Sequence, residues 1–324
     1  MLGVKKTSYE DGIRKKLYLI VSPWHYIWHY LLSIHDKKEG DSMRIGFIGA
    51  GRMGFTLGKF MVQHNIPVAG YFSRTKEHAE EAAKFTDTRY YENAEELINE
   101  CDAVFLTVSD GAIKTVFDEI VRYPETAGKI ICHTSGATSS QVFETDSAEI
   151  YGYSVHPIYA VSDRYESYKN FSNAFITIEG HDKYLDDIRS LFDEMGLNTG
   201  IIKTDTKSKY HASSVIASNL VCGLYGSAVR LLTECGFTED SARVALNGLF
   251  LDNASGIVNK GPVGQLTGPL ERNDITTVRN HLNVLGEEDK DLYVAASKEV
   301  LKLARKKNDD RDYSEMENLL NSAR

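Results

Sequence analysis

The chain has 324 residues, of which 42% are hydrophobic and 26% are charged. This composition is typical of a globular protein of about two domains, and it excludes a disordered chain. The formal net charge of -9 argues against a nucleic-acid-binding surface. The ten histidines are scattered along the sequence without a metal-ligand motif, so we expect no metal site.

Residues 1–42 precede the first predicted strand. The segment Leu17–Ile34 is apolar and aromatic, but Pro23, His25 and His29 interrupt it, which argues against a membrane span. A basic run comes before this segment, yet no signal-peptide cleavage site follows it. We interpret residues 1–42 as a poorly ordered extension, with a short amphipathic surface helix as the alternative. We expect a cytoplasmic protein with no membrane partner.

The stretch from Met43 to Gly54 predicts a dinucleotide site. A buried strand over 44–48 is followed by a G-x-G-x-x-G turn and then by a helix over 55–64. In such a turn the first glycine allows the tight bend, the second lets a pyrophosphate approach, and the third lets helix and strand pack closely. The predicted cofactor residues of this turn are Gly49, Ala50, Gly51, Arg52, Met53 and Gly54. A glycine turn without a ligand is the alternative.

The end of the second predicted strand, 67–72, indicates which dinucleotide binds. An NAD site places an acid on the ribose 2′-hydroxyl at this point, roughly 20 residues after the first glycine. Ser73 and Arg74 stand there instead, followed by Lys76, and cations of this kind suit a 2′-phosphate. We therefore predict NADP(H) rather than NAD. Alternatively, Arg74 and Lys76 are solvated loop charges.

Further strands alternate with helices, which predicts a parallel sheet with right-handed crossovers. Ligands of such sheets bind outside the carboxyl ends of the strands. Those ends supply the remaining predicted site residues of this half: Thr107, Val108 and Ser109 for the cofactor, Ser135 for cofactor and substrate, Gly136 for substrate, and His156 as a catalytic candidate. His156 precedes Pro157, which we expect to end its strand, and the imidazole either touches the site or only bonds a neighbouring loop.

From residue 204 onward the strand-like runs stop and a helical period takes over. The fold class is therefore α/β, with a Rossmann-type, mostly parallel sheet domain over 43–203 followed by an all-helical substrate and dimerisation domain over 204–324. The predicted helix over 207–235 is too apolar for a surface helix, so we expect it to be buried in a bundle or a dimer interface.

Two places in the helical half are candidates for chemistry. Lys209, at the opening of the long helix, can protonate a carbonyl oxygen during hydride transfer, or it is an exposed first-turn lysine. Asn219 is expected to be buried, with either the substrate or a neighbouring helix as its partner. Thr267 and Arg272 are candidates for a substrate carboxylate. A turn followed by a helix cap at Asp274 explains the same stretch without a ligand.

Taken together, the glycine turn, Ser73-Arg74, Thr134-Ser135-Gly136, His156-Pro157 and Lys209-Tyr210-His211 resemble a known family. The family joins a Rossmann-like domain to a helical domain of unknown function, DUF2520, and the resemblance covers roughly 43–322. Its clan includes ketopantoate reductases, pyrroline-5-carboxylate reductases and 3-hydroxyacid dehydrogenases.

The resemblance implies NADPH, a helical C-terminal domain and a homodimer formed through that domain. One feature departs from the ketopantoate reductases and 3-hydroxyacid dehydrogenases of this clan, in which Lys and Asn are spaced as K-x-x-x-N. Here the fourth residue after Lys209 is Ser213, and Asn219 lies about 15 Å further along a continuous helix.

These observations predict an NADP-dependent oxidoreductase that reduces a small 2-oxo acid. The best candidate is the reduction of 2-dehydropantoate (ketopantoate) to pantoate, a step of pantothenate biosynthesis. An imine reductase of the pyrroline-5-carboxylate reductase type and a non-catalytic NADP-binding protein are the alternatives.

Overall fold

A computed structural model describes residues 42–323 of the chain. These residues form two compact units, one ending at Ser214 and the other beginning at Val215, so the boundary falls inside helix α8 (Lys207–Ala217). The extension predicted over 1–42 lies outside the described residues except for Ser42.

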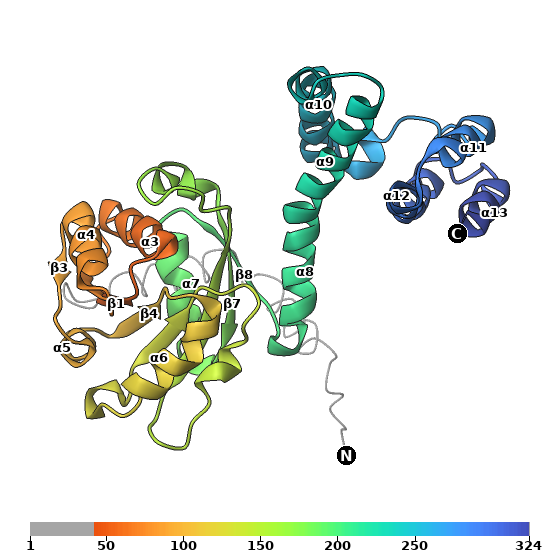
Figure 1. Cartoon of the computed structure of the whole chain (residues 1–324). Coiled ribbons are helices and arrows are strands. Elements are labelled where there is room, and N and C mark those ends of the chain that lie inside the picture. Colours follow the sequence, from red (N-terminus) through yellow and green to blue (C-terminus); the bar gives the residue numbers. More distant parts are fainter. Residues whose placement is uncertain (1–41, 324) are drawn as a thin grey trace, which may run out of the picture. The chain divides into compact units, whose positions relative to one another are not determined.

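An eight-stranded sheet runs through the first unit in the order β3-β2-β1-β4-β5-β6-β7-β8 (Figure 1). All neighbouring strands are parallel except the antiparallel pair β6–β7. The predicted Rossmann-type, mostly parallel sheet is thus confirmed. The strands are β1 (Ile45–Ile48), β2 (Val68–Phe72), β3 (Arg89–Tyr90), β4 (Ala103–Leu106), β5 (Ile130–His133), β6 (Tyr151–Ile158), β7 (Phe175–Gly180) and β8 (Asn198–Ile201).

Helices cover both faces of this sheet, which explains why the central strands β1 and β4 are buried at every position. Phe47 and Phe105 belong to a buried cluster that includes Phe55 and Phe192 on one face. Residues that alternate with them pack on the other face with side chains of α5 and α6. The helices are α3 (Arg52–Gln63), α4 (Lys76–Thr86), α5 (Ala94–Asn99), α6 (Ile113–Ile120) and α7 (Leu185–Glu194), with short 3-10 turns η1 (Asp110–Ala112), η2 (Pro124–Thr126), η3 (Ser140–Phe143), η4 (Ser167–Asn173), η5 (Asp182–Tyr184) and η6 (Thr204–Thr206).

Strand β6 corrects the prediction that His156-Pro157 ends the strand. β5 pairs with β6 only as far as Ser154, whereas β7 pairs with β6 from Tyr153 to Ile158. The last part of β6 therefore has one neighbour and is a local edge. Proline lacks an N–H and is tolerated at such an edge, so the strand passes through Pro157 to Ile158.

The second unit is entirely helical among its described residues. It contains the last part of α8 and then α9 (Asn219–Glu234), α10 (Glu239–Gln265), α11 (Ile275–Val284), α12 (Glu287–Lys307) and α13 (Ser314–Ser322). The predicted helix over 207–235 is interrupted at Ser218, whose φ of -128° and ψ of -78° are not helical. α10 kinks at Gly261, which has a φ of 74° and precedes Pro262.

Only the last three helices of this unit enclose a sizeable buried core. Its members include Val278 of α11, Leu301 of α12 and Leu320 of α13. In contrast, α9 buries only Val229, and α10 buries only Ala242 and Gly256. Within a single chain the long apolar segment is therefore exposed, which contradicts its predicted burial in a bundle of the same chain.

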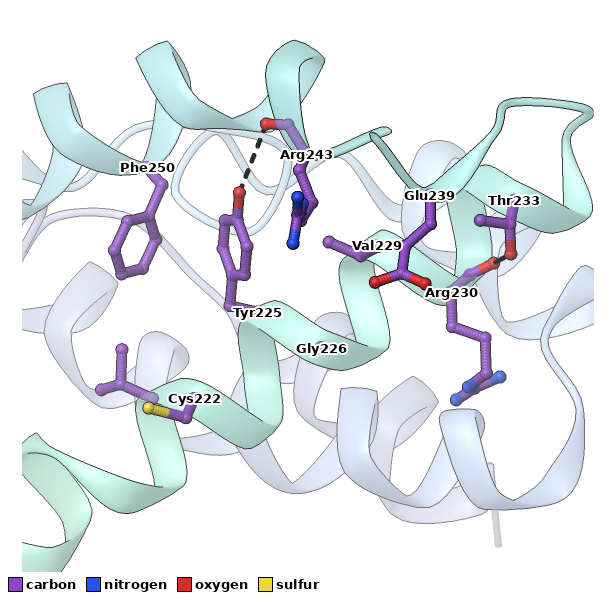
Figure 2. A pocket seen from close by; sticks show the side chains of 10 residues that line it. Cys222, Tyr225, Gly226, Val229, Arg230, Thr233, Glu239, Arg243 and Phe250 are labelled. Carbon is purple, nitrogen blue, oxygen red and sulfur yellow. Dashed lines mark hydrogen bonds between the residues drawn. The ribbon is translucent and has the colours of Figure 1, made fainter. Parts of the chain in front are cut away.

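A groove of about 550 Å³ lies between α9 and α10 (Figure 2). Tyr225 and Phe250 meet edge to face in it with ring centroids 5.0 Å apart. The Tyr225 hydroxyl donates a hydrogen bond to the Arg243 carbonyl oxygen at 3.3 Å.

The stretch Thr204–Glu234 is long and apolar enough to cross a membrane, by length and composition alone, and 6% of its most apolar window is buried. A single helix of this kind is weak support for a membrane span.

Candidate functional site

The glycine turn has the backbone geometry that a dinucleotide site requires. Gly49 has a φ of 103°, which favours glycine, and its N–H donates to the Phe72 carbonyl oxygen at 2.8 Å. The Thr107 hydroxyl donates to the Gly49 carbonyl oxygen at 2.7 Å. A Cβ atom at Gly54 would lie only 2.7 Å from that same hydroxyl oxygen. The turn is therefore locked against the end of β4.

Helix α3 begins directly after this turn without a side-chain cap. Gly51 is its N-cap residue and forms no side-chain hydrogen bond with the first turn. The N-terminal N–H groups and the helix dipole together favour an anion at this place. A Cβ atom at Gly51 would lie 3.3 Å from the Thr107 carbonyl oxygen. The absence of this side chain leaves the backbone open to a pyrophosphate group.

A cavity of about 380 Å³ opens beside the turn. Eight of the predicted cofactor residues line it, namely Gly49, Ala50, Gly51, Ser73, Arg74, Thr107, Val108 and Ser109. Arg52, Met53, Gly54 and Ser135 are not among its lining residues. Thr75, His78 and Arg164 also line the cavity, and the sequence had not singled them out. Glycine backbone, hydroxyls and cations at one strand edge suit the phosphates of a dinucleotide.

A second group of polar side chains gathers at the ends of β5 and β6 and the start of α8. Lys207 is 2% exposed, and its Nζ donates to the Ser154 hydroxyl at 2.5 Å. The Ser154 hydroxyl donates onward to the Ser135 carbonyl oxygen at 3.3 Å. Burial lowers the pKa of the Lys207 ammonium to about 8, and the carboxylates of Glu179 and Asp110 partly offset this effect. Lys207 thus exchanges a proton near neutral pH.

Glu179 fixes the surroundings of this lysine. Its carboxylate is 1% exposed and accepts hydrogen bonds from the Ser140 N–H and the Ser140 hydroxyl, both at 2.7 Å. It also accepts one from the Thr204 hydroxyl at 3.0 Å. The carboxylate therefore joins the loop after β5 to the turn that leads into α8. This connection holds the first turn of α8 against the sheet.

His156 lies in the same group of side chains. Its Nδ1 is 2.5 Å from the Tyr210 hydroxyl, to which the Thr177 hydroxyl donates at 2.6 Å. Burial, aided by the Lys207 charge, lowers the pKa of His156 to about 4, so the ring is neutral at pH 7. Burial also raises the pKa of Tyr210. These groups can orient a ligand or pass a proton along hydroxyls, but a neutral imidazole is a poor acid at neutral pH.

Gly136 allows two histidines to approach the end of β5. A Cβ atom there would lie 2.5 Å from Nδ1 of His211 and 2.8 Å from Nε2 of His156. Nδ1 of His211 is buried and has no hydrogen-bond partner among the described residues. The structure thus brings the predicted Ser135, Gly136 and His156 together around Lys207.

The other predicted catalytic and substrate residues lie at the surface. Lys209 is exposed, and so are Asn219, Thr267 and Arg272. Asn219, expected to be buried, begins α9 at the interruption of the helix and accepts a hydrogen bond from the Ser218 hydroxyl at 3.0 Å. Asp274 caps α11 by accepting a hydrogen bond from the Thr277 N–H at 3.0 Å. This agrees with the alternative in which the stretch is a turn followed by a helix cap and binds no ligand.

The sequence predicts Lys209 and not Lys207, because motif spacing does not show which face of the helix a lysine occupies. Tyr210 and His211 follow Lys207 by three and four residues, so all three share one face of α8. Lys209 lies on another face. Among the described residues, no group of three or more His, Cys, Asp or Glu side chains is placed to hold a metal ion.

Two family models match parts of the chain. Residues 44–135 match the family described as NADP oxidoreductase, coenzyme F420-dependent, and residues 174–300 match the domain of unknown function DUF2520. The suspected resemblance to the DUF2520-type proteins is confirmed. The first match, over residues 44–135, is to a family of NADP oxidoreductases and supports the predicted NADP(H) cofactor. No curated protein matches the sequence significantly.

Solved structures share the fold at low sequence identity. Protein TM1727 from Thermotoga maritima is 23% identical, with a TM-score of 0.65 over 82% of this chain and 99% of that one. A pyrroline carboxylate reductase from Plasmodium falciparum with NADP bound is 16% identical, with a TM-score of 0.55 over 82% and 97%. An imine reductase from Streptomyces aurantiacus is 13% identical, with a TM-score of 0.54 over 86% and 93%.

Proposed function

We propose that this chain, which joins an NADP oxidoreductase half to a DUF2520 half, is an NADPH-dependent reductase of a small 2-oxo acid. One observation carries the proposal: the cavity beside the glycine turn and the buried Lys207 lie at the carboxyl ends of parallel strands of one sheet. Ligands of open α/β sheets bind at this edge. Ketopantoate is the first substrate to test, and we expect the enzyme to act in the cytoplasm.

The residues of the cavity fit NADPH. Gly51 leaves room for the pyrophosphate, the first turn of α3 offers it N–H groups, and Ser73 and Arg74 suit the 2′-phosphate. When bound, NADPH supplies a hydride to the carbonyl carbon of the substrate. The carbonyl oxygen then needs a proton to complete the hydroxy acid.

Lys207 is our candidate for this proton donor, in place of the exposed Lys209. Its ammonium is buried and has the Ser154 hydroxyl as its hydrogen-bond partner, which is sparse compensation for a buried charge. The negative charge that develops on the substrate carbonyl oxygen would be stabilised by this ammonium, and the oxygen would accept a proton from it. The neutral His156, held by Tyr210, would help to orient the substrate, together with Ser135 and Gly136. We keep Thr267 and Arg272 as proposed substrate-binding residues and Asn219 as a proposed catalytic residue.

Reduction of a cyclic imine is the second candidate, because pyrroline carboxylate reductase and imine reductase share the fold. A protonated imine carries its own positive charge and needs no ammonium donor. A variant without Lys207 should therefore keep imine reduction while it loses reduction of 2-oxo acids. A third candidate, an NADP-binding protein without turnover, predicts neither activity.

The cofactor preference can be reversed at Arg74. We expect Arg74→Glu to raise the KM for NADPH by about 10- to 100-fold, because a cation on the 2′-phosphate is replaced by a like charge. The KM for NADH should change little, since its ribose carries no phosphate. Steady-state rates with both cofactors measure this difference. Equal effects on NADPH and NADH would remove Arg74 from the 2′-phosphate site.

We also propose that two copies of the chain associate through α9 and α10. These helices expose large apolar side chains that include Leu220, Leu224, Val244, Leu249 and Val258, the last being 84% exposed. The groove between α9 and α10 adds further apolar surface (Figure 2). A monomer rarely exposes so many apolar groups together. A second copy of the chain can cover this surface, because two-fold symmetric dimers, the commonest oligomers, bury the same surface of both subunits.

We expect the double variant Leu249→Glu/Val258→Glu to be a monomer, because charges would be buried in the proposed interface. The unchanged protein should have about twice the chain mass of 36.3 kDa in sedimentation equilibrium. Val284→Glu is the matched control, because Val284 is 81% exposed but belongs to α11. The proposed dimer would be contradicted if the protein without substitutions were a monomer. It would also be contradicted if this protein bound lipid vesicles in a flotation assay.

A further inference from the structure

The connection between β6 and β7 brings an additional arginine to the dinucleotide cavity. This connection covers residues 159–174 and includes η4. Arg164 lines the same cavity as Arg74, Thr75 and His78. It lies about 90 residues after the strand that supplies Arg74 and belongs to none of the usual elements of a glycine-turn site.

Aromatic packing anchors this connection to α3 and α4. Phe171 is fully buried and meets Phe60 of α3 edge to face, with ring centroids 5.2 Å apart. Tyr165 packs edge-on against Phe55 and Phe85 at 5.6 and 5.3 Å. The position of Arg164 is therefore set before any ligand arrives, which lowers the entropic cost of binding.

Local hydrogen bonds fix the backbone around Arg164 as well. The Asp163 carboxylate accepts from the N–H groups of Tyr165 at 2.7 Å and Glu166 at 3.0 Å. The Arg52 guanidinium, from the first turn of α3, donates to the Ser162 carbonyl oxygen at 3.3 Å. The connection is thus tied directly to the helix that starts at the glycine turn.

The guanidinium of Arg164 has donors left for a ligand. Its Nη1 bonds Glu81 of α4 at 3.0 Å, and its Cζ lies 5.2 Å from the centroid of the Phe55 ring. A guanidinium carries five N–H donors, of which one carboxylate uses only part. Both side chains are more than one-third exposed, so the ion pair is weak and a phosphate can compete with it.

We propose that Arg164 is a second cation for the 2′-phosphate of NADPH and that Glu81 holds it when no phosphate is present. The assignment rests on the proposed cofactor site. It favours the 2′-phosphate over the pyrophosphate because the ion-pair partner Glu81 lies on α4, three residues after the cavity residue His78. α4 follows β2, whose end binds the adenosine ribose in this fold.

Two variants that break the same ion pair test the assignment by isothermal titration calorimetry with NADPH and NADH. Arg164→Gln removes the phosphate ligand, so NADPH affinity should fall about 10- to 100-fold while NADH affinity stays unchanged. Glu81→Gln removes the competing charge but keeps an acceptor for the Tyr165 hydroxyl, which also bonds Glu81, so NADPH affinity should be kept or raised. Arg189→Gln, which removes an exposed arginine of α7, is the control and should change neither affinity.

A weaker affinity for NADPH in both Arg164→Gln and Glu81→Gln would show that the ion pair only fastens the connection, and would overturn the assignment. Equal losses for NADPH and NADH would place Arg164 at the pyrophosphate and overturn it too. If Arg164→Gln lowers the melting temperature, Arg164→Lys replaces it, because lysine keeps the positive charge and the aliphatic part of the side chain. Arg164→Lys should show a smaller loss of affinity, and for NADPH alone. If the unchanged protein bound neither dinucleotide, the proposed function itself would fail.

Discussion

Lys207→Met is expected to abolish most reduction of a 2-oxo acid while leaving NADPH binding intact. General acids of this kind contribute roughly 100- to 10,000-fold to the rate, so kcat should fall by that range. Methionine fills a similar volume without a buried charge, and Ser154 keeps the Ser135 carbonyl as an acceptor for its hydroxyl. The melting temperature should therefore stay the same or rise.

Lys209→Met is the matched control, because Lys209 is exposed on the same helix and its loss should leave kcat unchanged. The pH profile gives a second test. Reduction needs the protonated ammonium, whose pKa is lowered to about 8, so kcat/KM should fall above pH 8 by about tenfold per pH unit. No change in this alkaline limb in the Lys207 variant, or full activity of that variant, would exclude Lys207 as the acid.

Gly51→Ala is expected to weaken cofactor binding without unfolding the protein. Gly51 has a φ of -80°, which any residue adopts, and the added methyl would meet only the Thr107 carbonyl oxygen at 3.3 Å. The same methyl stands where the pyrophosphate must approach. An unrelieved contact of this type costs about 1–3 kcal/mol, or about 10- to 100-fold in the Kd for NADPH.

Gly111→Ala provides the control for this variant, because nothing lies within 4 Å of a Cβ atom at Gly111. Fluorescence titration with NADPH gives the Kd, and thermal unfolding reports on the fold. If Gly51→Ala bound NADPH as tightly as Gly111→Ala does, the pyrophosphate would not lie on the glycine turn.

The cofactor half was predictable because its signals are local. The glycine turn, its strand and its helix are contiguous in sequence, and each glycine answers a steric need that the structure shows at Gly49 and Gly54. The positions of Thr107 and Ser135 just after β4 and β5 followed from the rule that parallel strands share one edge. The extent of β6 did not follow, because Pro157 is tolerated only where β5 no longer pairs with it.

The proposed catalytic lysine was less predictable because its role depends on tertiary burial. Lys207 and Lys209 are two residues apart and chemically identical, and only the packing of α8 against β6 distinguishes them. Arg164 and Glu81 are 83 residues apart, so no sequence spacing joins them. The apolar character of the helix over 207–235 was predicted together with burial in a bundle or a dimer interface. A single chain leaves most of this helix exposed, so the bundle does not hold and the dimer interface stays a proposal.

Deuteride transfer tests the central claim most directly. NADPH carrying deuterium on the transferred position at C4 is incubated with the purified protein and a panel of small 2-oxo acids that includes ketopantoate, and the products are examined by NMR. We expect deuterium at the hydroxyl-bearing carbon of the product, with a much slower transfer from the equivalent NADH. Binding of NADPH without transfer to any 2-oxo acid of the panel would contradict the account.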